Sequence, residues 1–322
     1  MLSSSNGMRR HQATTAFALP CLCAAILLSA ACTTQASYQR QIKHTRELLL
    51  QAGDPDSLET AAFLTEFGKD EPAERLEAFA RADAAAPDRP DLIWLHLQAC
   101  GEVPSCTTGP LESRLQALDP ENGAAWAMSM KEALHTKDPT QLRAVTTAMG
   151  SAQRFDVYWN PIVLRTSRAL IKTGTMGSVH AVVLAYGLGA ALAIPSYQTI
   201  SQGCKGALLG PTEQLIACRH LSETLRNGDT VLTEMIGTLI AKRSWADTSP
   251  EFQDAVAARR LVRYRMDMGI KASDRLGINN KWAELNLRLL GETRTEQQVE
   301  LGLIKAAGLS PVPPADWVDS KP

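Results

Sequence analysis

The sequence predicts an all-α fold built from stacked antiparallel helix pairs. Aromatic residues make up only 5% of the 322 residues, and abundant alanine and leucine favour helix over sheet. Runs of alternating β-branched residues between turns, which are typical of strands, are missing. Helix start signals recur at short intervals, so most connections are short and neighbouring helices are expected to pack as antiparallel hairpins.

Capping residues and apolar periodicity set the expected helices. The Ser-Pro-Glu segment at 249–251 combines a serine cap, a proline at the first helical position and an acidic first turn. The segments 138–140 and 210–212 follow the same pattern, and Thr295 with Gln298 is suited to a capping box. Helices are expected at 37–51, 57–67, 72–85, 90–99, 111–118, 122–135, 139–151, 156–172, 176–193, 211–227, 230–244, 250–268, 279–290 and 295–307.

The most apolar stretch after the N-terminus runs from Val179 to Ile194. It falls short of the about twenty apolar residues that a membrane span needs, so it is predicted to be a buried helix that stops at Pro195. Gly187 and Gly189 are expected to let another helix approach closely. The proline-rich residues 310–322 are predicted to form an extended tail.

Three tryptophans, Trp94, Trp126 and Trp159, recur at intervals of 32 and 33 residues. Each is expected to open a helix that follows an alanine-containing helix, so that tryptophan fills the space between closely packed pairs. This pattern resembles the tetratricopeptide repeat, a helix pair of about 34 residues. The resemblance implies divergent repeats over residues 57–172, with a degenerate helical continuation over 173–309. The alternative is an irregular helical bundle.

The repeat pattern departs from the family in several ways. One residue is inserted between Pro87 and Trp94, and Gln153 stands where the family has proline. The glycine and tyrosine that follow the family's tryptophan are absent, and residues 100–110 interrupt the unit. The resemblance therefore rests on spacing and small residues more than on the complete repeat motif.

The N-terminus has the organisation of an export signal. Arg9 and Arg10 precede an apolar run over residues 17–28, and small residues then lead to Cys32. The end of this segment resembles the bacterial lipoprotein box, in which signal peptidase II cuts before a cysteine that carries the lipid, palmitate included. Ser29 departs from the aliphatic residue that most boxes have there.

By this resemblance, residues 1–31 are a lipoprotein signal peptide, and 32–56 hold the lipid tether and the first helix. Thr33 follows Cys32 where an aspartate, in the lipoprotein families, would favour retention in the inner membrane. The resemblance thus implies attachment to the periplasmic face of the outer membrane.

Cysteine parity agrees with export. Cleavage before Cys32 leaves five cysteines, and lipidation of one leaves Cys100, Cys106, Cys204 and Cys218. An even set is expected to form disulfides in an oxidising compartment. Three connectivities are open, and proximity in sequence favours the first pair with each other and the last two with each other. The alternative is four buried free thiols; the spacings do not match a zinc site.

Charge and motifs point away from several functions. Without Arg9 and Arg10 the chain has 31 basic and 34 acidic residues, so no overall attraction to nucleic acid is expected. The histidines that follow the signal stand singly, and neither a nucleophile elbow nor a phosphate-binding loop is found. Acidic pairs such as Glu292 and Glu296 are expected on solvated helix surfaces. No metal, cofactor or catalytic residue is assigned.

The one local charge cluster is the arginine-rich segment 259–265. Arg259 and Arg263 share a helix face and, with Arg265, are candidates for binding an acidic partner. Alternatively, these arginines lie over the core and pair with Asp254, Asp267 or neighbouring helices. The predicted function is a lipid-anchored, non-enzymatic adaptor or scaffold that binds an envelope protein or peptide. The alternatives are an envelope enzyme with a convergent site and a purely structural helical lipoprotein.

Overall fold

The computed structural model describes residues 37–65, 72–205 and 210–318, with the backbone alone at 192–196. Across these ranges the chain is all-α: helices account for the regular structure and no strand forms. A helix at 37–52 precedes α2. The others are α2 (Pro55–Leu64), α3 (Pro72–Ala85), α4 (Pro90–Cys100), α5 (Gly109–Leu118), the 3-10 helix η2 (Gly123–Trp126), α6 (Ala127–Thr136), α7 (Pro139–Ser151), α8 (Trp159–Lys172), α9 (Ser178–Gly203), α10 (Thr212–Arg226), α11 (Val231–Ser244), α12 (Pro250–Leu276), α13 (Asn280–Glu292) and α14 (Glu296–Ala306).

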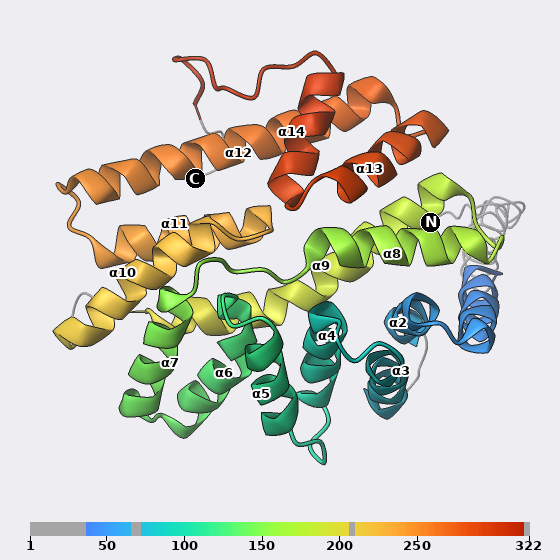
Figure 1. The fold of residues 1–322 in the computed structure, drawn as a ribbon. Helices are drawn as coiled ribbons and strands as arrows, with labels where there is room; N and C mark the ends of the chain where they lie inside the picture. The colour runs from blue at the N-terminus through green and yellow to red at the C-terminus, as the bar shows by residue number, and fades with distance from the viewer. Residues whose placement is uncertain (1–36, 66–71, 206–209, 319–322) are drawn as a thin grey trace, which may run out of the picture.

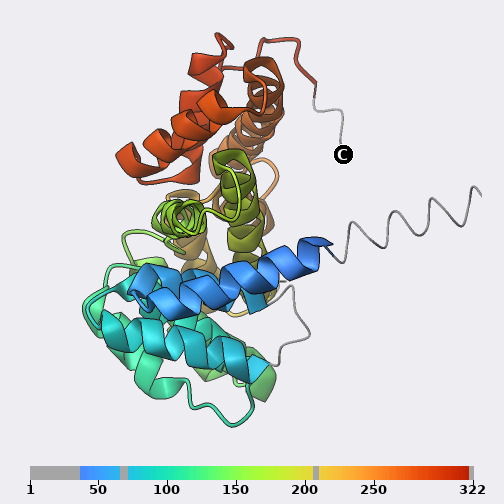
Figure 2. The ribbon, with the colours of Figure 1, turned by 90° about the vertical axis from the view of Figure 1, so that its right-hand side faces the viewer.

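The helices form three tiers. In Figure 1, α3 to α7 stand side by side in the lowest tier, α8 to α11 cross above them, and α12 to α14 lie on top. Figure 2 shows the same order from the side, with the helix at 37–52 against the lowest tier. Helices that follow each other in sequence pack together through most of the chain, which confirms the predicted antiparallel pairs.

Local capping explains why several boundaries match the sequence. Ser249 accepts a hydrogen bond from the Phe252 amide at the start of α12, and Asp138 caps α7 in the same way. Thr295 and Gln298 form the predicted capping box of α14. At α10 the prediction was partly wrong, because Pro211 is the residue before the helix and not its first residue.

Two helices run further than predicted. α9 continues through Pro195 to Gly203, and α12 continues to Leu276. A proline inside a helix costs about 3 kcal/mol, so packing beyond it must compensate. Tyr197, Ile200 and Cys204 are all buried, and the Tyr197 hydroxyl lies 2.8 Å from that of Thr230. These tertiary contacts explain why the helix does not stop at the proline.

The repeat tryptophans occupy different helix positions. Trp159 opens α8, Trp126 ends η2, and Trp94 lies inside α4, so the expectation that each opens a helix holds only for Trp159. Trp94 is buried and meets Tyr158 edge to face at 6.4 Å between ring centroids. This contact joins α4 to the start of α8, which are far apart in the sequence. The tetratricopeptide resemblance itself stays a prediction.

Close helix contacts occur at glycines on either side of α10. A Cβ on Gly150 of α7 would lie 2.9 Å from the Leu221 amide nitrogen of α10. One on Gly237 of α11 would lie 2.8 Å from the Ser222 carbonyl oxygen of α10. In α9, Gly189 packs against Trp159, as expected of a small residue, whereas Gly187 has open space.

Both predicted disulfides are present: Cys100 is bonded to Cys106 and Cys204 to Cys218. The first closes the turn after α4, where the interruption of the repeat was predicted. The second joins the end of α9 to α10. The alternative of free thiols is therefore wrong. Cys32, the predicted lipid attachment site, lies outside the described residues.

Replacing both Cys204 and Cys218 with serine is expected to lower the free energy of unfolding by about 3 kcal/mol. The bond spans 14 residues, and opening such a loop restores entropy to the unfolded chain. Urea unfolding followed by circular dichroism checks the value. The matched variant without Cys100 and Cys106, whose loop spans 6 residues, should lose less. An equal loss in both pairs would contradict the loop-length argument.

Candidate functional site

A buried junction ties the middle tier to the top tier. The Asp229 carboxylate accepts hydrogen bonds from the backbone amides of Val157 at 2.9 Å and Trp159 at 2.8 Å. The Asp229 carbonyl oxygen accepts from the Glu296 amide at 2.8 Å. In return, the Glu296 carboxylate accepts from the Val231 amide at 2.8 Å. These bonds fix the starts of α8, α11 and α14 relative to one another.

An open groove lies beside this junction, between α9 and α12. Its main part has a volume of about 510 Å³ and is walled by α9, α12, α13 and α14. A smaller part of about 190 Å³ extends toward the start of α11. The two parts share Val231, Met266 and Glu296, so they form one depression. We call it the C-terminal groove.

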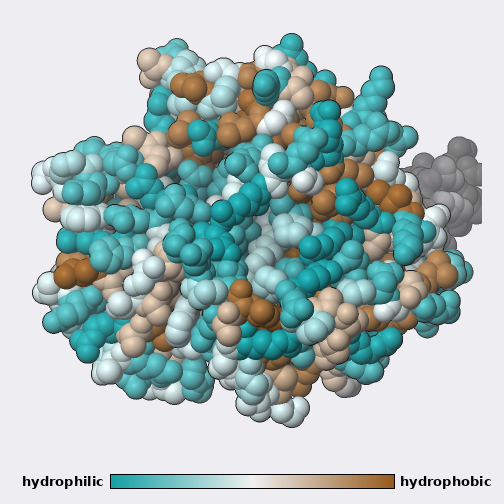
Figure 3. All heavy atoms as spheres, viewed as in Figure 1, coloured by the Kyte–Doolittle hydropathy of each residue, from teal (hydrophilic) through white to brown (hydrophobic). Residues whose placement is uncertain are grey.

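The walls of the C-terminal groove are mainly apolar, and much of this apolar surface meets solvent. Ile270 is 64% exposed and Ile278 57% exposed. Of the ten large apolar side chains that are exposed within the described ranges, five line the groove: Val183, Leu232, Met266, Ile270 and Ile278. Figure 3 shows brown, apolar patches over the upper helices on an otherwise largely teal face. Clustering of this kind marks binding surfaces more often than single exposed residues do.

Two glutamates of α14, Glu296 and Glu300, line the groove among these apolar residues. Burial raises the pKa of Glu296, although the hydrogen bond from Val231 opposes the shift. Burial, with the nearby charge of Glu296, raises the pKa of Glu300 to about 7. Arg265 of α12 is the neighbouring cation that lowers the pKa of Glu300. The groove thus combines apolar walls with carboxyl groups that are costly to ionise.

Glycine at position 269 makes room for one of these carboxyl groups. A Cβ there would lie 2.7 Å from Oε1 of Glu300. The Glu300 side chain therefore rests directly against the backbone of α12. Among the described residues it forms neither an ion pair nor a hydrogen bond.

Two of the three predicted arginines, Arg259 and Arg265, have different neighbours. Arg259 donates to the Met235 carbonyl oxygen of α11 at 3.4 Å, and Arg265 lies near Glu234 and Glu300. Asp254, one of the expected partners, instead pairs with Arg226 of α10 at 2.8 Å. All three arginines are partly buried. Their predicted contact with a partner stays a prediction.

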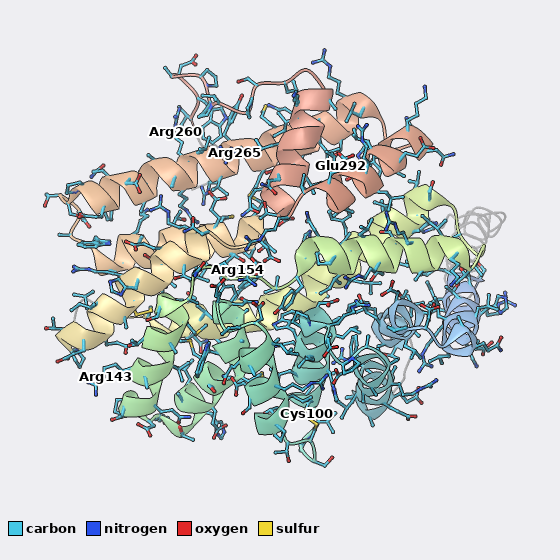
Figure 4. All side chains as sticks on the ribbon, viewed as in Figure 1. Cys100, Arg143, Arg154, Arg260, Arg265 and Glu292 are labelled. Carbon is cyan, nitrogen blue, oxygen red and sulfur yellow. A yellow bond between two sulfur atoms is a disulfide. The ribbon has the colours of Figure 1, made fainter. Side chains whose placement is uncertain are left out.

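Arg260, next to this set, holds the C-terminal tail. It donates to the carbonyl oxygens of Pro314 and Trp317 at 3.0 and 2.8 Å, and the Trp317 ring packs edge to face on Tyr264. Figure 4 shows Arg260 and Arg265 at separate places along α12. The tail is non-helical through residue 318, as expected.

Several other charged groups among the described residues link helices through shared ion pairs. Arg89 of the α3–α4 turn pairs with Asp91 and with the buried Glu59 of α2, and Arg165 of α8 also pairs with Asp91. Arg154, labelled near the centre of Figure 4, pairs with both Asp119 and Asp156. Such networks orient helices and leave few charges available to a ligand.

Sequence reasoning was wrong about Glu296. It was expected on a solvated helix surface with Glu292, but only Glu292 is exposed. Glu296 and Glu300 share the face of α14 that holds Val299 and Leu303, all lining the groove. The spacing of these acidic and apolar residues on one helix face was the sequence signal that could have predicted the burial of Glu296. The sequence does not show that α9, α12 and α13 come together around this face of α14 and leave a groove there.

Within the ranges that the structure describes, no three histidine, cysteine or acidic side chains gather as a metal site would require. None of the helices described is long and apolar enough to cross a membrane. Compared with known proteins, the chain matches no family model, no curated protein and no solved structure.

Proposed function

We propose that this protein is a lipid-anchored, non-enzymatic adaptor of the bacterial cell envelope that binds a protein or peptide through its helical body. The observation that carries the proposal is the C-terminal groove, an open depression in which half of the exposed large apolar side chains of the described residues collect. An exposed apolar patch lowers the solubility of a protein, so its presence is explained if the patch binds a partner.

The proposed location of the protein in the cell envelope is based on its N-terminal segment and its cysteines. The lipoprotein-like segment ending at Cys32 supports a lipid anchor, and the two disulfides fit an oxidising compartment such as the periplasm. The described chain enters a helix at residue 37, shortly after that cysteine. A tether this short would hold the body close to the membrane. With Thr33 after the anchor, we propose the periplasmic face of the outer membrane.

An envelope enzyme is the second candidate. One observation favours it: Glu296 and Glu300 lie one helical turn apart in a cavity, and the pKa of each is raised. Paired carboxyl groups of this kind serve general acid–base chemistry in many enzymes. Hydrolytic activity that disappears in a Glu300→Gln variant while partner binding persists would favour the enzyme over the adaptor.

Cys32→Ala tests the anchor. We expect the variant to lose at least tenfold of its membrane association, because an export signal without a lipidated cysteine gives no stable attachment after cleavage. Fractionation of cell envelopes, with palmitate labelling of both forms, measures this. Cys100→Ala, which removes a cysteine without touching the anchor, is the control. Unchanged membrane fractionation of Cys32→Ala would contradict lipid anchoring.

Crosslinking in cells, followed by affinity purification of the full chain, tests the adaptor role. We expect one envelope protein to be recovered reproducibly. The same experiment on a variant with Arg259, Arg263 and Arg265 changed to alanine tests the predicted arginine contact. Loss of the partner from a still-folded variant would place these arginines in the interface. Recovery of no partner from either form would count against an adaptor.

A further inference from the structure

We propose that the C-terminal groove binds an amphipathic helical segment of a partner protein, with a lysine or arginine of that segment reaching Glu300. The inference rests on the proposed adaptor function and names the chemistry of its partner. Three observations carry it: the shape of the groove, its uncompensated acidic groups, and the position of the chain's own tail.

The groove has the dimensions of a short helix contact. On α12, its lining residues Met266, Gly269, Ile270, Ser273 and Asp274 form a stripe with helical spacing. At 1.5 Å per residue this stripe is about 12 Å long, or roughly two turns. The facing stripe on α14 has the same spacing and nearly the same length. A segment of about two turns, with apolar residues at positions i, i+3, i+4 and i+7, matches such a site.

The groove also has an acidic character that the chain does not neutralise. Glu296 and Glu300 line it from α14 and Asp274 from α12, while Glu234 of α11 lies nearby. Arg265 is the cation that acts on Glu300, and it acts on Glu234 as well. Arg226 of α10 also acts on Glu234, so two arginines lie near four carboxyl groups, those of Glu296, Glu300, Asp274 and Glu234. A basic side chain entering the groove would correct this imbalance.

Glu300 is the group best placed to receive that basic side chain. It lines the open part of the groove, rests against Gly269, and has no ion pair or hydrogen bond with another described residue. Burying an unpaired carboxylate is costly, and a charge-assisted hydrogen bond from lysine or arginine offsets that cost. The same acidity disfavours ligands with carboxylate or phosphate heads, including fatty acids and lipid headgroups.

The C-terminal tail, as far as residue 318, does not line the groove. Trp317 packs on Tyr264 and Arg260 of α12, and none of the groove residues belongs to the tail. Tyr264 is not among the lining residues of either part of the groove. The described part of the tail thus leaves the groove open, and the charge of the groove favours a cationic, apolar occupant.

A pair of model peptides tests the proposal on the full chain in nanodiscs of zwitterionic lipid. The first is a fluorescent amphipathic helix of leucine and lysine, and the second has glutamate at every lysine position. Fluorescence anisotropy should show the lysine peptide binding at least tenfold more tightly, with empty nanodiscs as the blank. Ile270→Lys, at the exposed rim, should weaken that binding at least tenfold. Ile216→Lys, an exposed isoleucine of α10 outside the groove, should leave it unchanged.

The pH dependence of lysine-peptide binding distinguishes a contact with Glu300 from non-specific binding. The pKa of Glu300 is about 7, set by burial and by the charges of Glu296, Arg265 and Glu234, so its carboxylate forms between about pH 6 and 8. Binding of the lysine peptide should therefore tighten several-fold over this range. The Glu300→Gln variant should bind more weakly at pH 8 and show a flatter profile. A profile that keeps its slope in Glu300→Gln would overturn the assignment of Glu300.

Four outcomes would contradict the proposal. Equal binding of both peptides would remove the charge argument, and lysine-peptide binding that survives Ile270→Lys would place it on another surface. Sedimentation that shows a dimer lost in Ile270→Lys would mean that a second copy of this chain covers the groove. Recovery of the same cellular partner by intact protein and Ile270→Lys would keep the adaptor function while rejecting this site.

Discussion

Asp229→Ala is expected to lower the free energy of unfolding by about 4 kcal/mol. The carboxylate is buried and accepts hydrogen bonds from the backbone amides of Val157 and Trp159. Alanine would leave both buried donors without an acceptor, and each such group costs about 1–3 kcal/mol. Urea unfolding followed by circular dichroism measures the change.

Two control variants test whether the loss of stability comes from the hydrogen bonds that Asp229 accepts and not from the removal of an aspartate in general. Asp247→Ala removes an exposed aspartate from the turn before α12 and should change stability by less than about 0.5 kcal/mol. Asp229→Asn keeps one carbonyl oxygen and should cost about half as much as alanine. The backbone carbonyl oxygen of Asp229 also accepts a hydrogen bond from the start of α14. If Asp229→Ala displaces this segment, the position of α14 in the wall of the groove is expected to become less fixed. A loss below about 1 kcal/mol for Asp229→Ala would contradict the central role of this junction.

Glu300→Gln is expected to stabilise the protein at pH 8 by up to about 3 kcal/mol. The pKa of Glu300 is raised from 4.5 to about 7 in the folded state. The folded protein therefore holds this proton more tightly than the unfolded chain does, and stability falls as the pH rises from about 4.5 to 7. The loss is complete above pH 7. Each pKa unit corresponds to about 1.4 kcal/mol.

Burial also raises the pKa of Glu296 and of Glu234. The contribution of Glu300 is therefore measured as the difference between wild type and Glu300→Gln. Urea unfolding at pH 5 and pH 8 should show wild type losing more stability than Glu300→Gln between the two values. Glu292→Gln changes an exposed glutamate of the neighbouring helix α13 and should follow wild type. Parallel pH profiles for wild type and Glu300→Gln would show that the carboxyl group is not held in the apolar environment described.

Asp229 and Glu300, whose substitutions are predicted to have opposite effects on stability, belong to neighbouring parts of the structure. The hydrogen bonds that Asp229 accepts stabilise the junction at which the groove is assembled, while burial and the charge of Asp156 raise the pKa of this carboxyl group. Glu300 has no such hydrogen bonds and is expected to destabilise the groove at neutral pH. A carboxyl group kept at such a cost is typical of a site whose stabilising partner arrives with a ligand. The proposed cationic segment would supply that partner, so peptide binding should raise the unfolding temperature of wild type more than that of Glu300→Gln.

Local sequence determined the helix boundaries well where the deciding interactions lie within one turn. α3 and α7 begin and end as predicted. The Thr295 and Gln298 capping box and the Ser249 cap likewise depend on residues three positions apart. The disulfides were predicted from short separations along the chain, because closing a short loop costs little chain entropy.

The sequence by itself thus determined that this protein is a chain of short-linked helices with two local disulfides, since caps, periodicity and proximity act over a few residues. Tertiary structure decided that α9 passes through Pro195, because buried contacts at its far end outweigh the local cost. It also decided that Glu296 and Glu300 face a groove, because α9 and α12 to α14 meet there from positions up to about 120 residues apart. Burial and raised pKa values arise only from that convergence, which no local pattern specifies.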